Sequence, residues 1–117
     1  MMSCFALPYP PTANNLYRNV RKGRVKTDHY NAWLAEALAV LRGQRFTYVP
    51  GSYRLALVVD APDRRARDVD NLLKPVSDLL KKAGVISDDS KARKVSAEWS
   101  DTPPAKPGRV LVYVEAA

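Results

Sequence analysis

The sequence predicts a small domain that combines helices with a sheet. Apolar residues recur at helical spacing in two segments, residues 30–41 and residues 69–83. Four shorter segments have the apolar patterns of strands: residues 4–7, 53–59, 95–99 and 110–114. A chain of 117 residues is long enough for one hydrophobic core, so we expect a single domain over residues 1–117.

The first predicted strand, residues 4–7, leads into Pro8-Tyr9-Pro10-Pro11, which cannot continue a hydrogen-bonded ladder because proline lacks an N–H group. Residues 12–15 are then expected to form a turn. Residues 18–26 predict a basic hairpin or loop around Gly23. Its cations would contact phosphates, or the segment is a solvated surface loop. The cations are Arg18, Arg21, Lys22, Arg24 and Lys26.

The first predicted helix follows Thr27 or Asp28, either of which can cap it by accepting a hydrogen bond from a backbone N–H. Gly43 suits its end. Its aromatic residues Tyr30 and Trp33 share the apolar stripe, so we interpret them as core residues rather than a platform for stacking bases.

The strand over residues 53–59 is apolar on both faces, which predicts an inner strand covered on both sides. The second helical stripe ends at Gly84 and contains Pro75. Because Pro75 removes a hydrogen bond to the Asn71 carbonyl, it should either bend this helix or delay its regular start. Residues 102–108 form a proline-rich loop before the last strand.

The net charge of +7 and the pI of about 9.8 indicate a polyanionic partner, either nucleic acid or an anionic membrane. A membrane role is the weaker reading, because no apolar run is long enough to cross a bilayer and neither helix joins a long basic face to an exposed apolar one. The single cysteine, Cys4, forms no intrachain disulfide or zinc cluster. We expect no secretory signal, a cytoplasmic location, and no nucleotide cofactor, since a Gly-rich phosphate loop is absent.

The most informative segment is residues 62–74, in which Asp68 and Asp70 stand where a strand gives way to a helix. Carboxylates this close repel one another unless a cation lies between them. If the backbone is extended there, both point to the same side and can grip one ion. The pair Asp88-Asp89 could complete such a site.

Hard carboxylate oxygens favour Mg²⁺, which can also hold a phosphate oxygen. Lys74, four residues after Asp70, would stand beside the ion and stabilise charge on a phosphoryl group. Helix capping explains the same acids without a metal: Asp68 as an N-cap, Asp70 as a favourable charge in the first turn, and the Asp88-Asp89 pair as a cap of the next segment.

Three stretches, residues 8–18, 62–74 and 82–89, resemble the RusA family of Holliday junction resolvases. The resemblance implies a small α+β domain, with a mixed sheet of about four strands flanked by two main helices. It also implies a homodimeric bacterial or phage-encoded endonuclease, dependent on Mg²⁺ with Mn²⁺ as a substitute, that cuts four-way DNA junctions with paired nicks. The family's essential aspartates fall on Asp68, Asp70 and Asp89, and its lysine on Lys74. Asp88 and Asn15 are candidate supporting residues.

We therefore expect a nuclease of DNA recombination and repair whose partner is branched DNA. The DNA backbone would be held by residues 18–26 and by three arginines beside the acids, Arg64, Arg65 and Arg67. Two alternatives remain open: a branched-DNA-binding module without catalysis, whose acids only cap helices, and a nuclease that acts on flaps or other branched DNA.

Overall fold

A computed structural model describes residues 2–12 and 15–117 of the chain. Its main sheet has four strands in the order β1-β6-β4-β5. Strand β6 runs antiparallel to both of its neighbours, whereas β4 and β5 are parallel. The predicted α+β class with a mixed four-stranded sheet is confirmed. The strands are β1 (Met2–Pro8), β4 (Tyr53–Asp60), β5 (Ala92–Trp99) and β6 (Arg109–Ala116).

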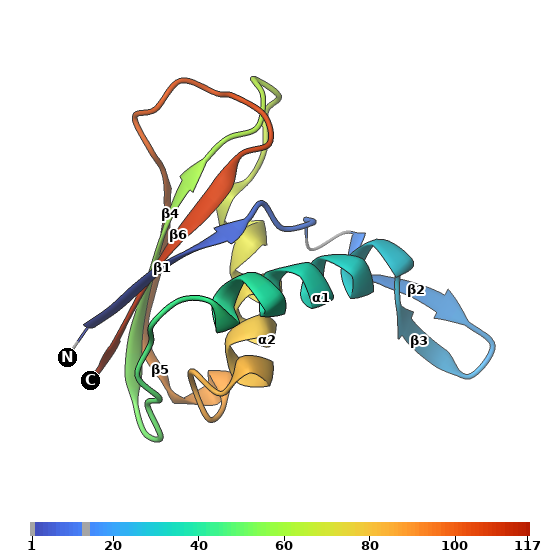
Figure 1. Ribbon diagram of the computed structural model, residues 1–117. Coiled ribbons are helices and arrows are strands. Elements are labelled where there is room, and N and C mark those ends of the chain that lie inside the picture. The colour runs from blue at the N-terminus through green and yellow to red at the C-terminus, as the bar shows by residue number, and fades with distance from the viewer. Residues whose placement is uncertain (1, 13–14) are drawn as a thin grey trace.

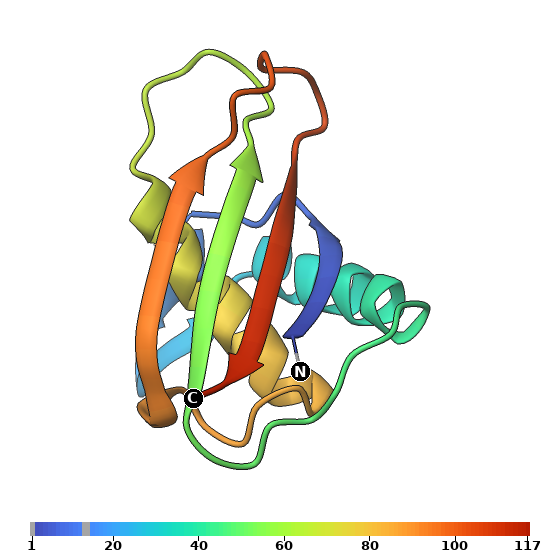
Figure 2. The ribbon, with the colours of Figure 1, turned by 90° about the vertical axis from the view of Figure 1, so that its left-hand side faces the viewer.

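Helices α1 (Asp28–Arg42) and α2 (Leu73–Ala83) both lie on one face of this sheet (Figure 1). Among the described residues, no helix lies on the opposite face (Figure 2). The predicted inner position of the strand over residues 53–59 is confirmed, but its coverage on both faces is wrong. Ala56 and Val58 face the bare side. No helix of the described chain covers them there, but Tyr113 and Leu111 lie directly opposite them on β6 and leave them half-buried.

The core fills the space between the helices and the sheet. Strand β4 contributes every second residue to it, as expected for a strand with one covered face. The predicted helical stripes supply the other side, including Tyr30 and Trp33, which are 0% and 5% exposed. Both aromatic residues are therefore core residues, as predicted. The buried residues of β4, β6 and α2 are Tyr53, Leu55, Leu57, Val59, Val110, Val112, Val114, Pro75, Val76, Leu79 and Leu80.

Thr27 caps helix α1 with a side chain that makes two hydrogen bonds. Its hydroxyl accepts from the Tyr30 N–H at 3.1 Å and donates to the Asn15 carbonyl at 2.8 Å. The same residue therefore starts the helix and fixes the segment before the hairpin. The predicted turn over residues 12–15 includes residues 13 and 14, which lie outside the described part of the chain. Across it, the Asn15 N–H donates to the Thr12 carbonyl at 2.9 Å.

Strands β2 (Tyr17–Val20) and β3 (Gly23–Lys26) form a separate antiparallel hairpin, as predicted. It projects beyond α1 and away from the main sheet (Figure 1). Tyr17 joins its base to the core, because its ring meets the Tyr30 ring edge-on with 6.0 Å between the centroids.

The parallel pair β4–β5 is joined by loop 61–68, the 3₁₀ helix η2 (Val69–Leu72), helix α2 and the 3₁₀ helix η3 (Asp89–Lys91). Pro75 is the third residue of α2, so its missing N–H falls in the first turn, where backbone N–H groups have no intrahelical acceptor. The delayed regular start, one of two predicted effects of Pro75, is confirmed. Gly84 ends the helix with a φ of 79°, in the left-handed region that glycine favours.

Loop 61–68 lies beside the proline-rich loop that precedes β6 (Figure 2). Gly108 allows this close approach: a Cβ there would lie 2.8 Å from the Asp60 carbonyl oxygen, and its φ is +72°. Within residues 2–12 and 15–117, no helix is both long enough and apolar enough to span a membrane.

Candidate active site

Asp68 and Asp70 lie at an irregular helix start, as the sequence indicated. Asp68 has an extended backbone, with φ −89° and ψ 115°, and occupies the N-cap position of η2. Asp70 is already inside the 3₁₀ helix, so the uniformly extended geometry proposed for the pair holds for Asp68 alone. The Asp68 side chain makes no capping hydrogen bond, which argues against helix capping as its role.

Lys74 pairs with Asp78 one turn further along α2, and not with Asp70. Its Nζ lies 3.1 Å from Asp78 Oδ1, while the Tyr30 hydroxyl donates to Asp78 Oδ2 at 2.7 Å. The hydrogen bond to Asp78 raises the pKa of Lys74, and the nearby charge of Asp89 adds to that rise. Burial, together with the hydrogen bond to Asp78, raises the pKa of Tyr30. The lysine is therefore protonated and held by a buried tyrosine through one carboxylate.

The two acids of the Asp88-Asp89 pair differ in their surroundings. Asp88 caps η3 by accepting from the Ser90 N–H at 3.1 Å, and it pairs with Lys81 at 2.8 Å. The Lys81 contact, followed by the Ser90 hydrogen bonds, lowers the pKa of Asp88. Capping, offered as an alternative for this pair, is thus correct for Asp88. The carboxylate of Asp89 is exposed and makes no hydrogen bond or ion pair with the rest of the described chain.

Asp68, Asp70 and Asp89 are all exposed, and none of these carboxylates is engaged by another side chain in the described ranges. Hard oxygen donors that are free of protein partners suit a divalent cation. However, the described residues contain no group of three or more His, Cys, Asp and Glu side chains placed to hold a metal ion. The donor chemistry fits, while the three-carboxylate cluster is not formed by these residues.

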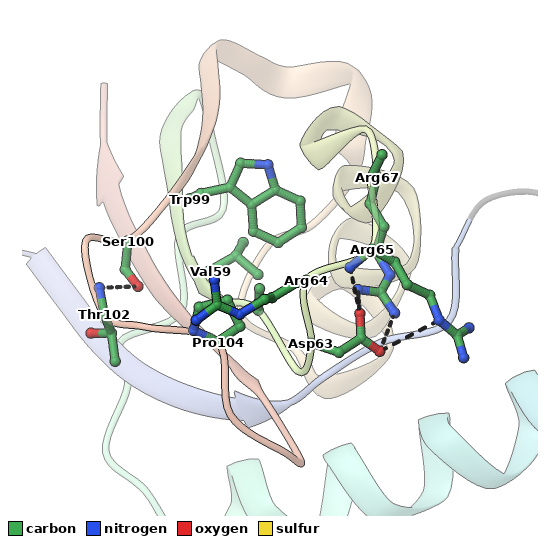
Figure 3. Close-up of a pocket in the computed structure, with 11 residues that line it drawn as sticks. Val59, Asp63, Arg64, Arg65, Arg67, Trp99, Ser100, Thr102 and Pro104 are labelled. Carbon is green, nitrogen blue, oxygen red and sulfur yellow. Dashed lines mark hydrogen bonds and ion pairs between the residues drawn. The ribbon is translucent and has the colours of Figure 1, made fainter.

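The arginines before Asp68 have unequal freedom. Arg67 makes a two-point contact with Asp63, at 2.5 and 3.0 Å, and the Arg65 backbone N–H also donates to Asp63 at 3.0 Å. The Arg67 contact, and then the Arg65 N–H, hold the pKa of Asp63 well below its usual range. Arg64 points away from this group (Figure 3). Asp63 therefore shapes the loop, and Arg64 and the exposed end of Arg65 remain available to a ligand.

The five hairpin cations also divide by position. Arg24 lies 4.7 Å from the centroid of the Tyr17 ring, and Lys26 is paired with Tyr17 across the hairpin, so both face the body of the protein. Arg21 and Lys22 lie in the turn at the tip and are exposed. Arg18 is exposed on the other face of the hairpin. The tip and the outer face are thus the parts of the hairpin whose cations are free to contact an anionic ligand.

A protein-family model described as Endodeoxyribonuclease RusA matches residues 8–115. The chain belongs to the RusA family. Curated relatives named crossover junction endodeoxyribonuclease RusA support this membership. The relative from Enterobacteria phage HK97 is 31% identical over 86 residues, which cover 73% of this chain and 72% of the relative. The relative from Aquifex aeolicus is 35% identical over 86 residues, covering 72% and 67%. The relative from Enterobacteria phage 82 is 31% identical over 109 residues, covering 92% and 89%.

Sequence reasoning missed three residues in or near the candidate site. Asp78 stands four residues after Lys74, a spacing that makes two helical side chains neighbours and that could have revealed the pair. The hydrogen bond from Tyr30 joins two helices and leaves no signal in either one. Trp99 was assigned only to a strand, yet it lines a pocket together with Arg64.

Proposed function

We propose that this RusA-family chain is an endodeoxyribonuclease that resolves Holliday (four-way) junctions by paired symmetric nicks during DNA recombination and repair. The family match over residues 8–115 carries the proposal. The relatives are named for crossover junctions, and a basic chain with exposed, unpaired aspartates suits a phosphodiester substrate. Residues 1–117 would act as one RusA-like endonuclease domain in the bacterial cytoplasm.

We propose a divalent metal cofactor, Mg²⁺, with Mn²⁺ able to replace it. Mg²⁺ is usually held by one or two carboxylates together with waters and phosphates, so it does not need a three-carboxylate cage. Asp68, Asp70 and Asp89 are the proposed ligands, because the family resemblance places the essential aspartates at these positions and their carboxylates have no ion-pair partner among the described residues. When bound, such an ion would lower the pKa of a water and offset charge on the phosphoryl oxygens.

The chain's own side chains would hold the substrate around that centre. Lys74, protonated and fixed by Asp78, would offset the charge that develops on the scissile phosphate. Arg64 and Arg65 would grip flanking phosphates, and the hairpin tip would contact an arm of the junction. Asp88 and Asn15 would support the site through backbone geometry, since Asp88 caps η3 and the Asn15 carbonyl accepts from Thr27.

We further propose that the chain acts as a homodimer. A four-way junction offers two symmetric phosphodiesters, and a two-fold dimer would present one active site to each of them. Because phosphate contacts dominate such binding, affinity for the junction should fall steeply as salt is raised.

The test is cleavage of a synthetic four-way junction with Mg²⁺ by the wild-type chain and by Asp70→Asn. Glu36→Gln serves as the control, since it removes one negative charge from an exposed position on α1 outside the site. We expect symmetric nicks from the wild type and the control, and none from Asp70→Asn. No cleavage by the wild type, or full activity in Asp70→Asn, would contradict the proposal.

A junction-binding module without catalysis is the second candidate, favoured by the capping role of Asp88 and by the lack of a three-acid group among the described residues. It predicts tight junction binding in EDTA and no cutting with any divalent ion. Parallel assays with flap and four-way substrates would separate a junction resolvase from a nuclease for other branched DNA.

A further inference from the structure

A pocket lies at the carboxyl ends of the parallel strands β4 and β5 (Figure 3). Val59 and Trp99, which are opposite one another in these strands, both line it. Loop 61–68 and the segment that follows Trp99 close the other sides. Crevices outside the carboxyl ends of parallel strands are frequent ligand sites in sheets with helical crossovers. Because loop 61–68 runs directly into Asp68, a ligand in this pocket would lie next to the proposed active site.

Trp99 supplies this pocket with an aromatic wall. Its side chain is partly exposed, although it also packs against the hydrophobic core. Its indole N–H makes no hydrogen bond within the described ranges. Ala61 and Pro104 add further apolar surface. A flat aromatic ring in a largely apolar recess suits the face of another planar group.

The pocket is also positively charged. Three arginines and one aspartate line it, and the aspartate, Asp63, is already paired with Arg67. The nearby carboxylate of Asp60 is likewise engaged, by the Ser100 hydroxyl at 2.5 Å and by Arg109 at 2.7 Å. Arg64 lies on the side away from Asp63 and has no carboxylate partner among the described residues. The chemistry that fits is a planar aromatic group joined to an anion.

Contacts in the protein hold the loops that form this pocket. The Asp63–Arg67 contact closes loop 61–68 on itself, and Arg67 also lies 5.8 Å from the centroid of the Tyr9 ring. The Ala105 N–H donates to the Ala61 carbonyl at 3.0 Å, a normal length for a backbone hydrogen bond. This hydrogen bond ties the two loops together. A pocket held in this way loses little conformational entropy when a ligand enters.

We propose that this pocket receives a nucleobase whose stacking is interrupted at the branch point of the DNA. Trp99 would stack on the base, and Arg64 would contact the adjoining phosphate. The proposal deepens the function proposed above, since it rests on branched DNA being the substrate. Stacking between a base and an aromatic side chain tolerates any base, so the pocket would recognise the interruption and not a sequence. A continuous duplex, whose bases remain stacked, would leave the pocket empty.

The test measures binding in EDTA, so that it does not depend on cleavage. Wild-type, Trp99→Leu and Trp99→Phe chains are titrated with a four-way junction whose branch-point nucleotides are intact or abasic. Tyr48→Leu is the matched control, because Tyr48 is an aromatic residue with 52% exposure that does not line the pocket. We expect Trp99→Leu to weaken binding of the intact junction at least about fivefold, and Trp99→Phe, which keeps a ring, to weaken it less.

The abasic junction decides the matter, because wild type and Trp99→Leu should bind it equally. An equal loss on both junctions, or no loss on either, would overturn the proposal. Fluorescence of the wild-type chain gives a check that needs no variant: Trp33 is buried, so quenching on junction binding should come from Trp99. Unchanged emission would count against stacking. If binding follows these expectations and no cutting occurs with Mg²⁺, the nuclease function fails while the base pocket stands.

The role of Arg64 is tested in the same titrations. Arg64→Gln should weaken junction binding and lower the slope of log affinity against log salt by about 1, as expected for the loss of one phosphate contact. Arg45→Gln removes the same charge from an exposed position outside the pocket and should leave the wild-type ratio of junction to duplex affinity unchanged. Equal effects of the two substitutions on that ratio would show that Arg64 acts only through the general charge of the surface.

Discussion

The hydrogen bond between Tyr30 and Asp78 should couple helix α1 to the lysine of the proposed active site. Tyr30 is fully buried and donates to Asp78 at 2.7 Å, and the other oxygen of that carboxylate holds Lys74 at 3.1 Å. We consider Asp78→Asn and Tyr30→Phe, separately and together. Neither substitution changes side-chain volume much, so their effects report on the hydrogen bonds rather than on packing.

The expected magnitude follows from the exposure of each partner. The Lys74–Asp78 pair, in which the lysine side chain is 51% exposed, contributes about 0.3–0.5 kcal/mol. A hydrogen bond to a charged acceptor contributes about 1.5–3 kcal/mol, against about 0.5–1.5 kcal/mol for a neutral one. The Tyr30 hydrogen bond should therefore contribute about 1 kcal/mol less to stability in Asp78→Asn. Together, the two losses should lower the free energy of unfolding of Asp78→Asn by about 1.5 kcal/mol, which at about 4 °C per kcal/mol lowers its melting temperature by roughly 6 °C.

Thermal and urea unfolding of the four chains would give the coupling between the two sites. If the hydrogen bond exists as described, the double variant should be about 1 kcal/mol more stable than the sum of the single losses predicts. Coupling smaller than about 0.3 kcal/mol, which is within the usual error of additivity, would refute the reasoning.

The same contact predicts a dependence on pH at the alkaline end. The folded state raises the pKa of Lys74, chiefly through Asp78, and that of Tyr30, chiefly through burial. Groups with a raised folded pKa stabilise the fold below their unfolded pKa and lose that contribution as pH rises through the folded value. The free energy of unfolding should therefore fall above about pH 10, and fall less in Asp78→Asn. An identical alkaline profile in the two chains would contradict this account.

Three further outcomes are expected. Gly108→Ala should destabilise the fold by more than about 1 kcal/mol in urea unfolding, because its Cβ would lie 2.8 Å from the Asp60 carbonyl oxygen; an unchanged midpoint would show that the loops separate freely. The Ser100 hydrogen bond, together with an arginine contact, lowers the pKa of Asp60, so stability should drop as pH falls below about 4, and less so in Asp60→Asn. Arg21→Gln with Lys22→Gln should reduce the salt dependence of junction binding; an unchanged slope would exclude contacts from the hairpin tip.

Local patterns were sufficient to predict most of this fold. The helical stripes, the Thr27 cap and the delayed helix start at Pro75 depend on residues close in sequence, and all are present in the structure. The bare face of the sheet was not predictable in this way. On that face, Ala56 and Val58 pack beside Tyr113 and Leu111 of β6. In the sequence of β4, apolar residues that pack against a neighbouring strand look the same as apolar residues that pack under a helix.

The candidate site was predicted less completely, for a related reason. The spacing in the sequence indicated Asp68, Asp70 and the Asp88-Asp89 pair, and the family resemblance then selected Asp89, whereas the distances among these acids depend on how η2 and η3 pack. The link from Lys74 to Tyr30 crosses between two helices, and the pocket at Trp99 needs two loops that are far apart in sequence. Spacing along the sequence indicates a contact only when both residues lie on the same helix or strand, and these contacts join different ones.

The position of β6 has a consequence for assembly of the molecule. The last strand of the described chain lies between the first strand and β4, and it is the only neighbour in the main sheet that β1 has. Until residues 109–116 are available, β1 has no partner strand in the main sheet, and the edge of β4 that pairs with β6 is open. A growing chain would therefore hold two unsatisfied edges until residues 109–116 are made, a state prone to pairing with other chains. Loss of a few residues from β6 should thus cause aggregation rather than a gradual loss of activity.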